Sequence, residues 1–148
     1  MSLDKKDKLI LSLLQEDSTL SVKEISEKIG LTFTPTYERI KNLEKSGVVE
    51  KYVALLNREK LGINIVVYCN VRLKEQSQNT LKDFENYISK YDEVQEIISL
   101  SGEYDYMLKI IAKDINSYND FTVNVISNIP SIGQYHSSIV LAEVKKTT

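Results

Sequence analysis

Four polar side chains recur between residues 35 and 46 at spacings that place them on one side of a helix. At about 100° per residue, Glu38, Lys41, Asn42 and Lys45 point away from a narrow apolar stripe. Ammonium groups bind phosphates, whereas carboxamides and carboxylates exchange hydrogen bonds with the edges of adenine and cytosine. A helix with this outer face has the chemistry to read the major groove of DNA. The alternative is a helical hairpin whose outer face is only solvated.

The preceding residues predict a brace for that helix. Ser21 and Glu24 have the spacing of a capping box, so a first helix should begin directly after Ser21. Gly30 permits the left-handed turn that ends it. Thr34 would then cap the second helix, and Pro35 would be its first residue. These signals together predict a helix-turn-helix, whose second helix contacts DNA.

Two further residues of the second helix have specific expectations. Arg39 lies about 70° from the inward stripe, where it can donate to a phosphate or pair with Glu24 or Glu27. Thr36 places a hydroxyl on that stripe, and we expect this hydroxyl to donate to a backbone carbonyl one turn earlier. The inward stripe consists of Thr36, Ile40 and Leu43.

The composition is that of a globular protein of one domain or two small ones. The chain has 148 residues, of which 42% are hydrophobic. No apolar run approaches the ~20 residues of a membrane span, and the N-terminus is too charged for a signal peptide, so we expect a cytoplasmic protein without a membrane partner. Cys69, the single cysteine, lies in an apolar run and is interpreted as a buried strand thiol. Because His136 is the single histidine, a histidine-rich metal site is excluded. We expect no metal, cofactor or catalytic residue.

Charge is divided unevenly between the two halves. Residues 1–60 carry 11 Lys and Arg against 10 Asp and Glu, and residues 61–148 carry 8 against 11, within a formal net charge of −2. DNA binding must therefore depend on a few local cations, Lys41, Lys45 and Lys51. We expect modest affinity per protomer, strong salt dependence and a dimer that reads two half-sites.

The hydrophobic pattern predicts an α+β chain with a domain boundary near residue 60. A helix over residues 4–15 completes a three-helix winged head, with residues 48–56 as a strand that serves as wing or bridge. The second half reads βαββαβ, with strands at 63–73, 94–100, 104–112 and 134–144 and helices at 78–90 and 115–128. This order predicts a ferredoxin-like antiparallel sheet with both helices on one face. A second copy would cover the other face, which predicts a two-fold dimer.

The two halves resemble the Lrp/AsnC family of bacterial and archaeal transcription regulators over nearly the whole chain. The motifs that carry the resemblance are DKKDKLILSLLQEDSTLSVKEISEKIGL, LTFTPTYERIKNLEKSGVVEKYVALLN, SGEYDYMLKI and IPSIGQYHSSIVLAEVK. It implies a DNA-binding head (residues 1–60, with a hinge strand) and a ferredoxin-like ligand-sensing and dimerisation domain (residues 61–148). Its partners would be operator DNA and a free amino acid bound between dimers, in a homodimer that assembles further into tetramers or octamers.

The resemblance also implies where the effector binds. The loop Gly102-Glu103-Tyr104-Asp105 is expected beside the pocket, and so is the start of the last strand. The predicted effector residues are Gly102, Tyr104, Asp105, Gln134, Tyr135 and Ser137. An amino acid's ammonium suits Asp105, although an Asx-type turn would explain this carboxylate equally well.

Two other functions compete with that of a ligand-responsive regulator. A metabolite sensor with a non-functional head is favoured slightly by the acidic balance and disfavoured by the intact cap, turn and proline start of the helix-turn-helix. The sirohaem decarboxylases share the two-domain layout, but one histidine and a single Arg72 in the second half are too few for their chemistry. We therefore predict that the chain is not an enzyme.

Overall fold

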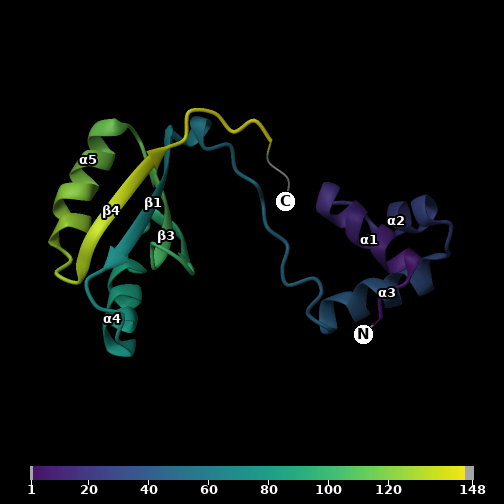
Figure 1. Cartoon of the computed structure of the whole chain (residues 1–148). Helices are drawn as coiled ribbons and strands as arrows, with labels where there is room; N and C mark the ends of the chain where they lie inside the picture. Colours follow the sequence, from purple (N-terminus) through teal and green to yellow (C-terminus); the bar gives the residue numbers. More distant parts are fainter. Residues whose placement is uncertain (1, 146–148) are drawn as a thin grey trace. The chain divides into compact units, whose positions relative to one another are not determined.

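Capped helices define the N-terminal part of the chain, whose computed structural model describes residues 2–145. The helices are α1 (Lys5–Glu16), α2 (Val22–Ile29) and α3 (Phe33–Lys45) (Figure 1). Asp4 and Asp7 form a reciprocal capping box on α1, and Ser21 and Glu24 form the predicted one on α2. Each box satisfies orphan amides of a first turn. The chain divides into two compact units between Leu55 and Leu56. Residues 1 and 146–148, at the outer ends of the predicted domains, lie outside the described residues.

The turn between α2 and α3 has the predicted left-handed glycine. Gly30 has φ +66°, and the amide of Leu31 donates to the carbonyl of Ser26 at 3.0 Å, which closes the end of α2. The ammonium of Lys6 donates to the carbonyl of Ile29 at the same helix end. A core then joins the three helices through buried side chains, Ile10, Ile25, Ile29, Ile40 and Leu43. The helix-turn-helix is therefore packed from both sides of its turn.

The start of α3 differs from the prediction. The N-cap is Thr32, whose side chain makes no capping hydrogen bond, and the helix begins at Phe33. Thr34 is thus the second helical residue and not the cap, and Pro35 is the third and not the first. Pro35 is tolerated there because the first amides of a helix have no partner within it. The predicted back-bond is confirmed, since the Thr36 hydroxyl donates to the Thr32 carbonyl at 2.9 Å.

The strand predicted over residues 48–56 is wrong for the described chain. Residues 50–56 have no regular secondary structure, and four of their apolar side chains are exposed: Tyr52, Val53, Leu55 and Leu56. The alternating β-branched pattern reports a side-chain preference, but a strand also needs a neighbour that pairs with its backbone. The described residues 2–145 provide no such neighbour.

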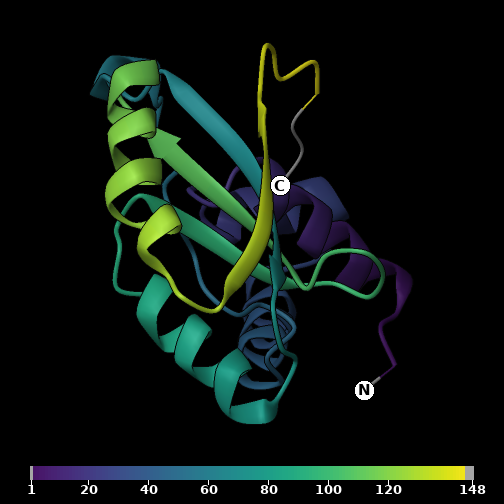
Figure 2. The ribbon, with the colours of Figure 1, turned by 60° about the vertical axis from the view of Figure 1, so that its left-hand side comes forward.

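The C-terminal unit is the predicted antiparallel sheet with two helices. Its elements are β1 (Ile65–Leu73), α4 (Gln78–Ile88), β2 (Val94–Ser99), β3 (Tyr106–Ala112), α5 (Ile115–Asn124) and β4 (Ile132–Ile139), with short 3₁₀ turns at Glu59–Leu61 and Ile126–Asn128. The strand order is β2-β3-β1-β4, and all pairs are antiparallel. Both helices lie on the same side of the sheet (Figure 2).

Two element ends in this unit are corrected. The helix predicted over residues 115–128 ends at Asn124 and continues as a 3₁₀ turn, and the last strand ends at Ile139 and not at residue 144. The Val140 amide still donates to the Val66 carbonyl at 2.9 Å, but residues 141–145 form no strand, and Leu141 and Val144 are almost fully exposed. The core lies between sheet and helices, where Phe84, Leu108 and Ile126 are fully buried. None of the helices within residues 2–145 has the length and apolar character needed to cross a bilayer.

Candidate nucleic-acid interface

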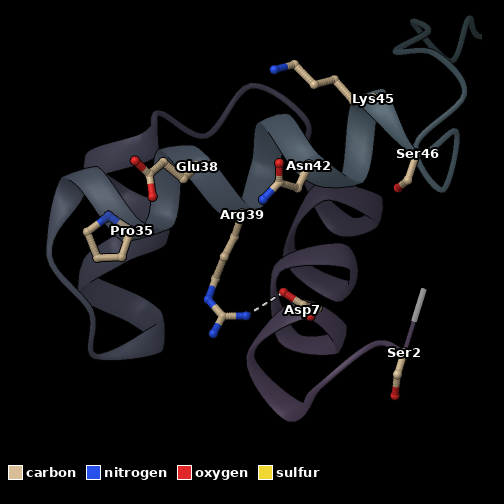
Figure 3. Close-up of a pocket in the computed structure, with 8 residues that line it drawn as sticks. All are labelled: Ser2, Asp7, Pro35, Glu38, Arg39, Asn42, Lys45 and Ser46. Carbon is tan, nitrogen blue, oxygen red and sulfur yellow. Dashed lines mark hydrogen bonds and ion pairs between the residues drawn. The ribbon is translucent and has the colours of Figure 1, made fainter.

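The outer face of α3 carries the predicted DNA-contacting side chains. Thr34, Pro35, Glu38, Asn42 and Lys45 are exposed, while the stripe on the opposite side is buried. A hollow of about 630 Å³ runs along one flank of this face (Figure 3). A second hollow, of about 380 Å³, is lined by Tyr37, Glu38, Lys41, Asn42 and Lys45. The exposed face is therefore a ridge between two grooves, a shape that fits between the walls of a major groove.

Arg39 pairs with the carboxylates at the start of α1 and not with Glu24 or Glu27. Its guanidinium lies 2.7 Å from Asp7 and 2.8 Å from Asp4, and Figure 3 shows it reaching from α3 to Asp7. These hydrogen bonds raise the pKa of Arg39. The pKa of Asp4 is lowered, first because its carboxylate accepts the Asp7 amide and then because of Arg39. Arg39 thus clamps α3 to the N-terminus of α1.

Lys41 and Lys45 differ in how free their charges are. The ammonium of Lys41 lies 2.6 Å from the carboxylate of Glu44, which raises the pKa of Lys41 and lowers that of Glu44. The hydroxyl of Tyr52 donates to the same carboxylate at 3.1 Å. Lys45 is exposed, and no side chain in residues 2–145 pairs with it. Of these two lysines, Lys45 can therefore meet a phosphate without first breaking an ion pair.

An aromatic pair on α3 was missed by the sequence reasoning. Phe33 and Tyr37, one turn apart, stack with centroids 6.2 Å apart and planes within 6°. Both rings remain exposed, Phe33 at 55% and Tyr37 at 44%. The i, i+4 spacing was the available signal, but it becomes visible only once the helix is known to begin at Phe33.

The predicted effector residues lie on either side of one end of β1. Asp105 accepts a hydrogen bond from the Leu73 amide at 2.7 Å, and its own amide donates to the Val71 carbonyl at 2.9 Å. On the other side of β1, Gln134 is opposite Arg72. The effector residues before β3 and those on β4 are thus about 10 Å apart, which is two interstrand spacings. The Asp105 carboxylate does not cap its own loop, as an Asx turn would require, but fastens β3 to β1.

The residues of β4 point to opposite faces of the sheet. Tyr135 packs against the core on the helix side, and its hydroxyl lies 3.3 Å from that of Ser127. The hydroxyl of Ser137 lies 2.6 Å from that of Tyr118 in the same layer. Gln134 is exposed and, by strand alternation, points to the other face. Gln134 and Tyr135 of the predicted set line a common hollow, of about 260 Å³, beside Ile126 and Ile132.

Cys69 and His136 are the other two residues whose side chains could carry chemistry. Cys69 is buried, and burial raises the pKa of its thiol, which disfavours the reactive thiolate. His136 is exposed on β4. Within residues 2–145, no three His, Cys, Asp or Glu side chains are grouped so that they could hold a metal ion.

Comparison with known proteins assigns a family to this arrangement. Residues 3–50 match a winged helix-turn-helix DNA-binding model, and residues 66–148 match the Lrp/AsnC ligand binding domain. The chain belongs to the Lrp/AsnC family. It is a DNA-binding transcriptional regulator and not an enzyme.

Similar proteins cover nearly the whole length of the chain. The transcriptional regulator AzlB of Bacillus subtilis is 38% identical over 145 residues, which cover 98% of this chain and 92% of AzlB. The DNA-binding transcriptional activator DecR of Escherichia coli is 32% identical, with 99% and 96% covered. A transcriptional regulator of Neisseria meningitidis, solved as a complex with L-Met, has a TM-score of 0.94 at 33% identity, with 99% and 95% covered. These members of the Lrp/AsnC family share both domains with this chain.

Proposed function

We propose that residues 1–60 bind an operator through the exposed face of α3 and that residues 61–148 sense a small effector. The proposed DNA-contacting residues are Thr34, Pro35, Glu38, Lys41, Asn42 and Lys45, with Arg39 holding α3 in place. The observation that carries this proposal is the ridge of exposed polar side chains opposite the buried stripe Thr36, Ile40 and Leu43. We also propose a cytoplasmic location, where the DNA of a bacterium or archaeon is accessible.

Each proposed contact has a chemical role. Lys45 and, after release from Glu44, Lys41 neutralise phosphates, which contributes affinity independent of sequence. Asn42 can exchange two hydrogen bonds with adenine, and Glu38 can accept from the amine of cytosine. Arg39 is engaged by Asp4 and Asp7 and acts as a positioning residue.

Selection of duplexes from a random pool tests this proposal. The full-length protein should enrich one sequence family, and a mobility-shift titration of that duplex should show at least tenfold weaker binding when Lys41 and Lys45 are both changed to Ala. The matched control is Lys82→Ala with Lys90→Ala, in the C-terminal unit, which should leave binding unchanged. If no duplex is enriched, the chain is a metabolite sensor with a non-functional head. If the double lysine variant binds undiminished, α3 is not the phosphate-contacting helix.

For the effector we propose a free amino acid or related metabolite at Gly102, Tyr104, Asp105, Gln134, Tyr135 and Ser137. The L-Met complex of the similar Neisseria regulator supports this ligand class. The hollow beside Gln134 and Tyr135 combines polar groups with the apolar side chains of Ile126, Ile129 and Ile132. It is open in a single protomer, which suits a site completed by a second dimer.

A thermal-shift screen of the twenty amino acids tests the effector proposal. At a concentration of 100 times Kd, a binding amino acid stabilises the folded state by about 2.7 kcal/mol, which is readily measured as a higher Tm. Sedimentation with each hit then shows whether assembly changes. The matched variant is Tyr135→Phe, which removes only the hydroxyl near Ser127. No stabilisation by any amino acid would refute this ligand class.

We propose a homodimer, and further assembly to tetramers or octamers, through the sheet face opposite α4 and α5. Alternate residues of the central strands point there, among them Tyr68, Met107 and Ile111. The central position of Met107, between Asn70 and Ile98 in the sheet register, makes Met107→Asp the natural test. This variant should sediment as a monomer. A dimer of unchanged affinity would place the interface elsewhere.

A further inference from the structure

Two stacked aromatic rings lie at the start of α3 on the flank of its exposed face. Phe33 is the first helical residue and Tyr37 follows one turn later. Their faces contact each other, yet about half of each side chain is exposed. The core of the N-terminal unit is complete without them. Exposed aromatic surface of this kind is usually covered when a protein binds its partner.

Tyr37 belongs to the same hollow as the polar residues of α3. That hollow, of about 380 Å³, is lined by Tyr37, Glu38, Lys41, Asn42 and Lys45. The aromatic pair is therefore continuous with the face that meets DNA and is not a separate patch. The N-terminal residues of a reading helix are the ones that reach furthest into the groove.

Charged neighbours hold the Tyr37 ring in place. The ammonium of Lys41 lies 5.8 Å from the ring centroid, and Glu44 pairs with that ammonium. Phe33 stacks beside Tyr37 with the ring centroids 6.2 Å apart, and both rings keep exposed surface. A preordered apolar edge loses little conformational entropy on binding.

We infer that Phe33 and Tyr37 read thymine through its 5-methyl group. This methyl is the only alkyl group that a base edge displays in the major groove, where it lies beside hydrogen-bond donors and acceptors. An apolar edge that enters the groove is matched by a thymine methyl and is left against polar groups by cytosine. The pair thus determines specificity beside the hydrogen bonds of Glu38 and Asn42. This inference rests on the proposal that α3 is the reading helix.

Replacement of thymine by deoxyuridine removes only this methyl. The probe is a duplex enriched by the full-length protein from a random pool, resynthesised with every dT changed to dU. One buried methyl contributes roughly 0.8 kcal/mol, or about fourfold in Kd. We expect the wild type to bind the dU duplex at least about fourfold more weakly than the dT duplex. In a variant with Phe33→Ala and Tyr37→Ala, this ratio should fall to about one.

A matched control comes from the other unit. Ile115 is also an exposed first residue of a helix, α5, so Ile115→Ala repeats the type of change away from DNA. The Ile115→Ala variant should keep the wild-type ratio of Kd for the dU duplex to Kd for the dT duplex. Circular dichroism and sedimentation should be unchanged in the aromatic variant, because both rings are exposed.

Each contrary result has a distinct meaning. A wild type that binds dT and dU duplexes alike would overturn thymine reading and leave DNA binding intact. A ratio that persists without the aromatic rings would mean that other residues contact the methyl. A change in sedimentation of the aromatic variant would make the pair a protein contact. If no duplex is enriched at all, the proposed function of α3 fails and not this inference alone.

Discussion

The Arg39 clamp should stabilise the head by an amount that can be worked out from its geometry. The pair with Asp4 involves a carboxylate that is half exposed, so solvent screens this pair and it adds little to stability. The Asp7 side chain is only 11% exposed, and a hydrogen bond to such a charged group contributes about 1.5–3 kcal/mol, reduced here because Arg39 is one-third exposed. We therefore expect Arg39→Met, which keeps the apolar stem, to destabilise the head by about 2 kcal/mol.

Hydrogen exchange of the full-length protein measures this loss where it occurs. A loss of about 2 kcal/mol raises the opening equilibrium roughly 30-fold, so amides of α1 and α3 should exchange about 30 times faster. Amides of α4, in the other unit, should be unchanged. Lys45→Met is the matched control, because Lys45 lies on the same helix and no side chain in residues 2–145 pairs with it. Its effect should stay within about 0.5 kcal/mol.

A double-mutant cycle isolates the contact with Asp7. Asp7→Asn keeps an oxygen for the Asp4 amide but removes the charge that faces Arg39. Arg39→Met and Asp7→Asn should couple by at least about 1 kcal/mol. A coupling near zero would refute the clamp and return Arg39 to the alternative role of a phosphate contact.

Three further predictions follow from the same geometry. Glu44→Gln should strengthen DNA binding, because Lys41 then meets a phosphate without first giving up its ion pair; unchanged affinity in a mobility-shift titration would mean that Lys41 does not meet phosphate. The folded-state pKa of Asp4 is lowered, so the stability that its carboxylate contributes is complete above its unfolded pKa near 4 and is lost as the pH falls through its folded pKa. Hydrogen exchange in α1 should therefore show that the head loosens below about pH 4. The loosening should be smaller in Asp4→Asn. Gly30→Ala should destabilise the head by about 1–2 kcal/mol through backbone strain alone, since nothing lies within 3.4 Å of the added methyl. A urea unfolding curve that this variant leaves unchanged would contradict a left-handed Gly30.

Local signals in the sequence predicted local structure well. The capping box of Ser21 and Glu24, the left-handed Gly30 and the back-bonded Thr36 hydroxyl each depend on residues at most four positions apart. The βαββαβ order was equally visible, because each strand and helix has its own hydrophobic period. The start of α3 was missed by two residues because Thr32 caps it without a side-chain hydrogen bond, so Thr34-Pro35 offered the stronger apparent signal.

Contacts between distant residues were beyond the sequence. Arg39 lies 35 and 32 residues from its partners Asp4 and Asp7, and the amphipathic pattern of α3 gives only its direction. Asp105 and Leu73 are likewise joined by sheet topology and not by spacing. Residues 48–56 show the opposite error, since a β-like pattern was present where the described chain offers no strand to pair with.

The most direct test of the account compares selected and scrambled duplexes of equal composition. For the wild type, the ratio of the two affinities measures base reading, because phosphate contacts contribute equally to both. Glu38→Ala with Asn42→Ala should lower this ratio at least tenfold and leave affinity for the scrambled duplex unchanged. A ratio that survives this double change would show that the exposed face of α3 does not read the operator.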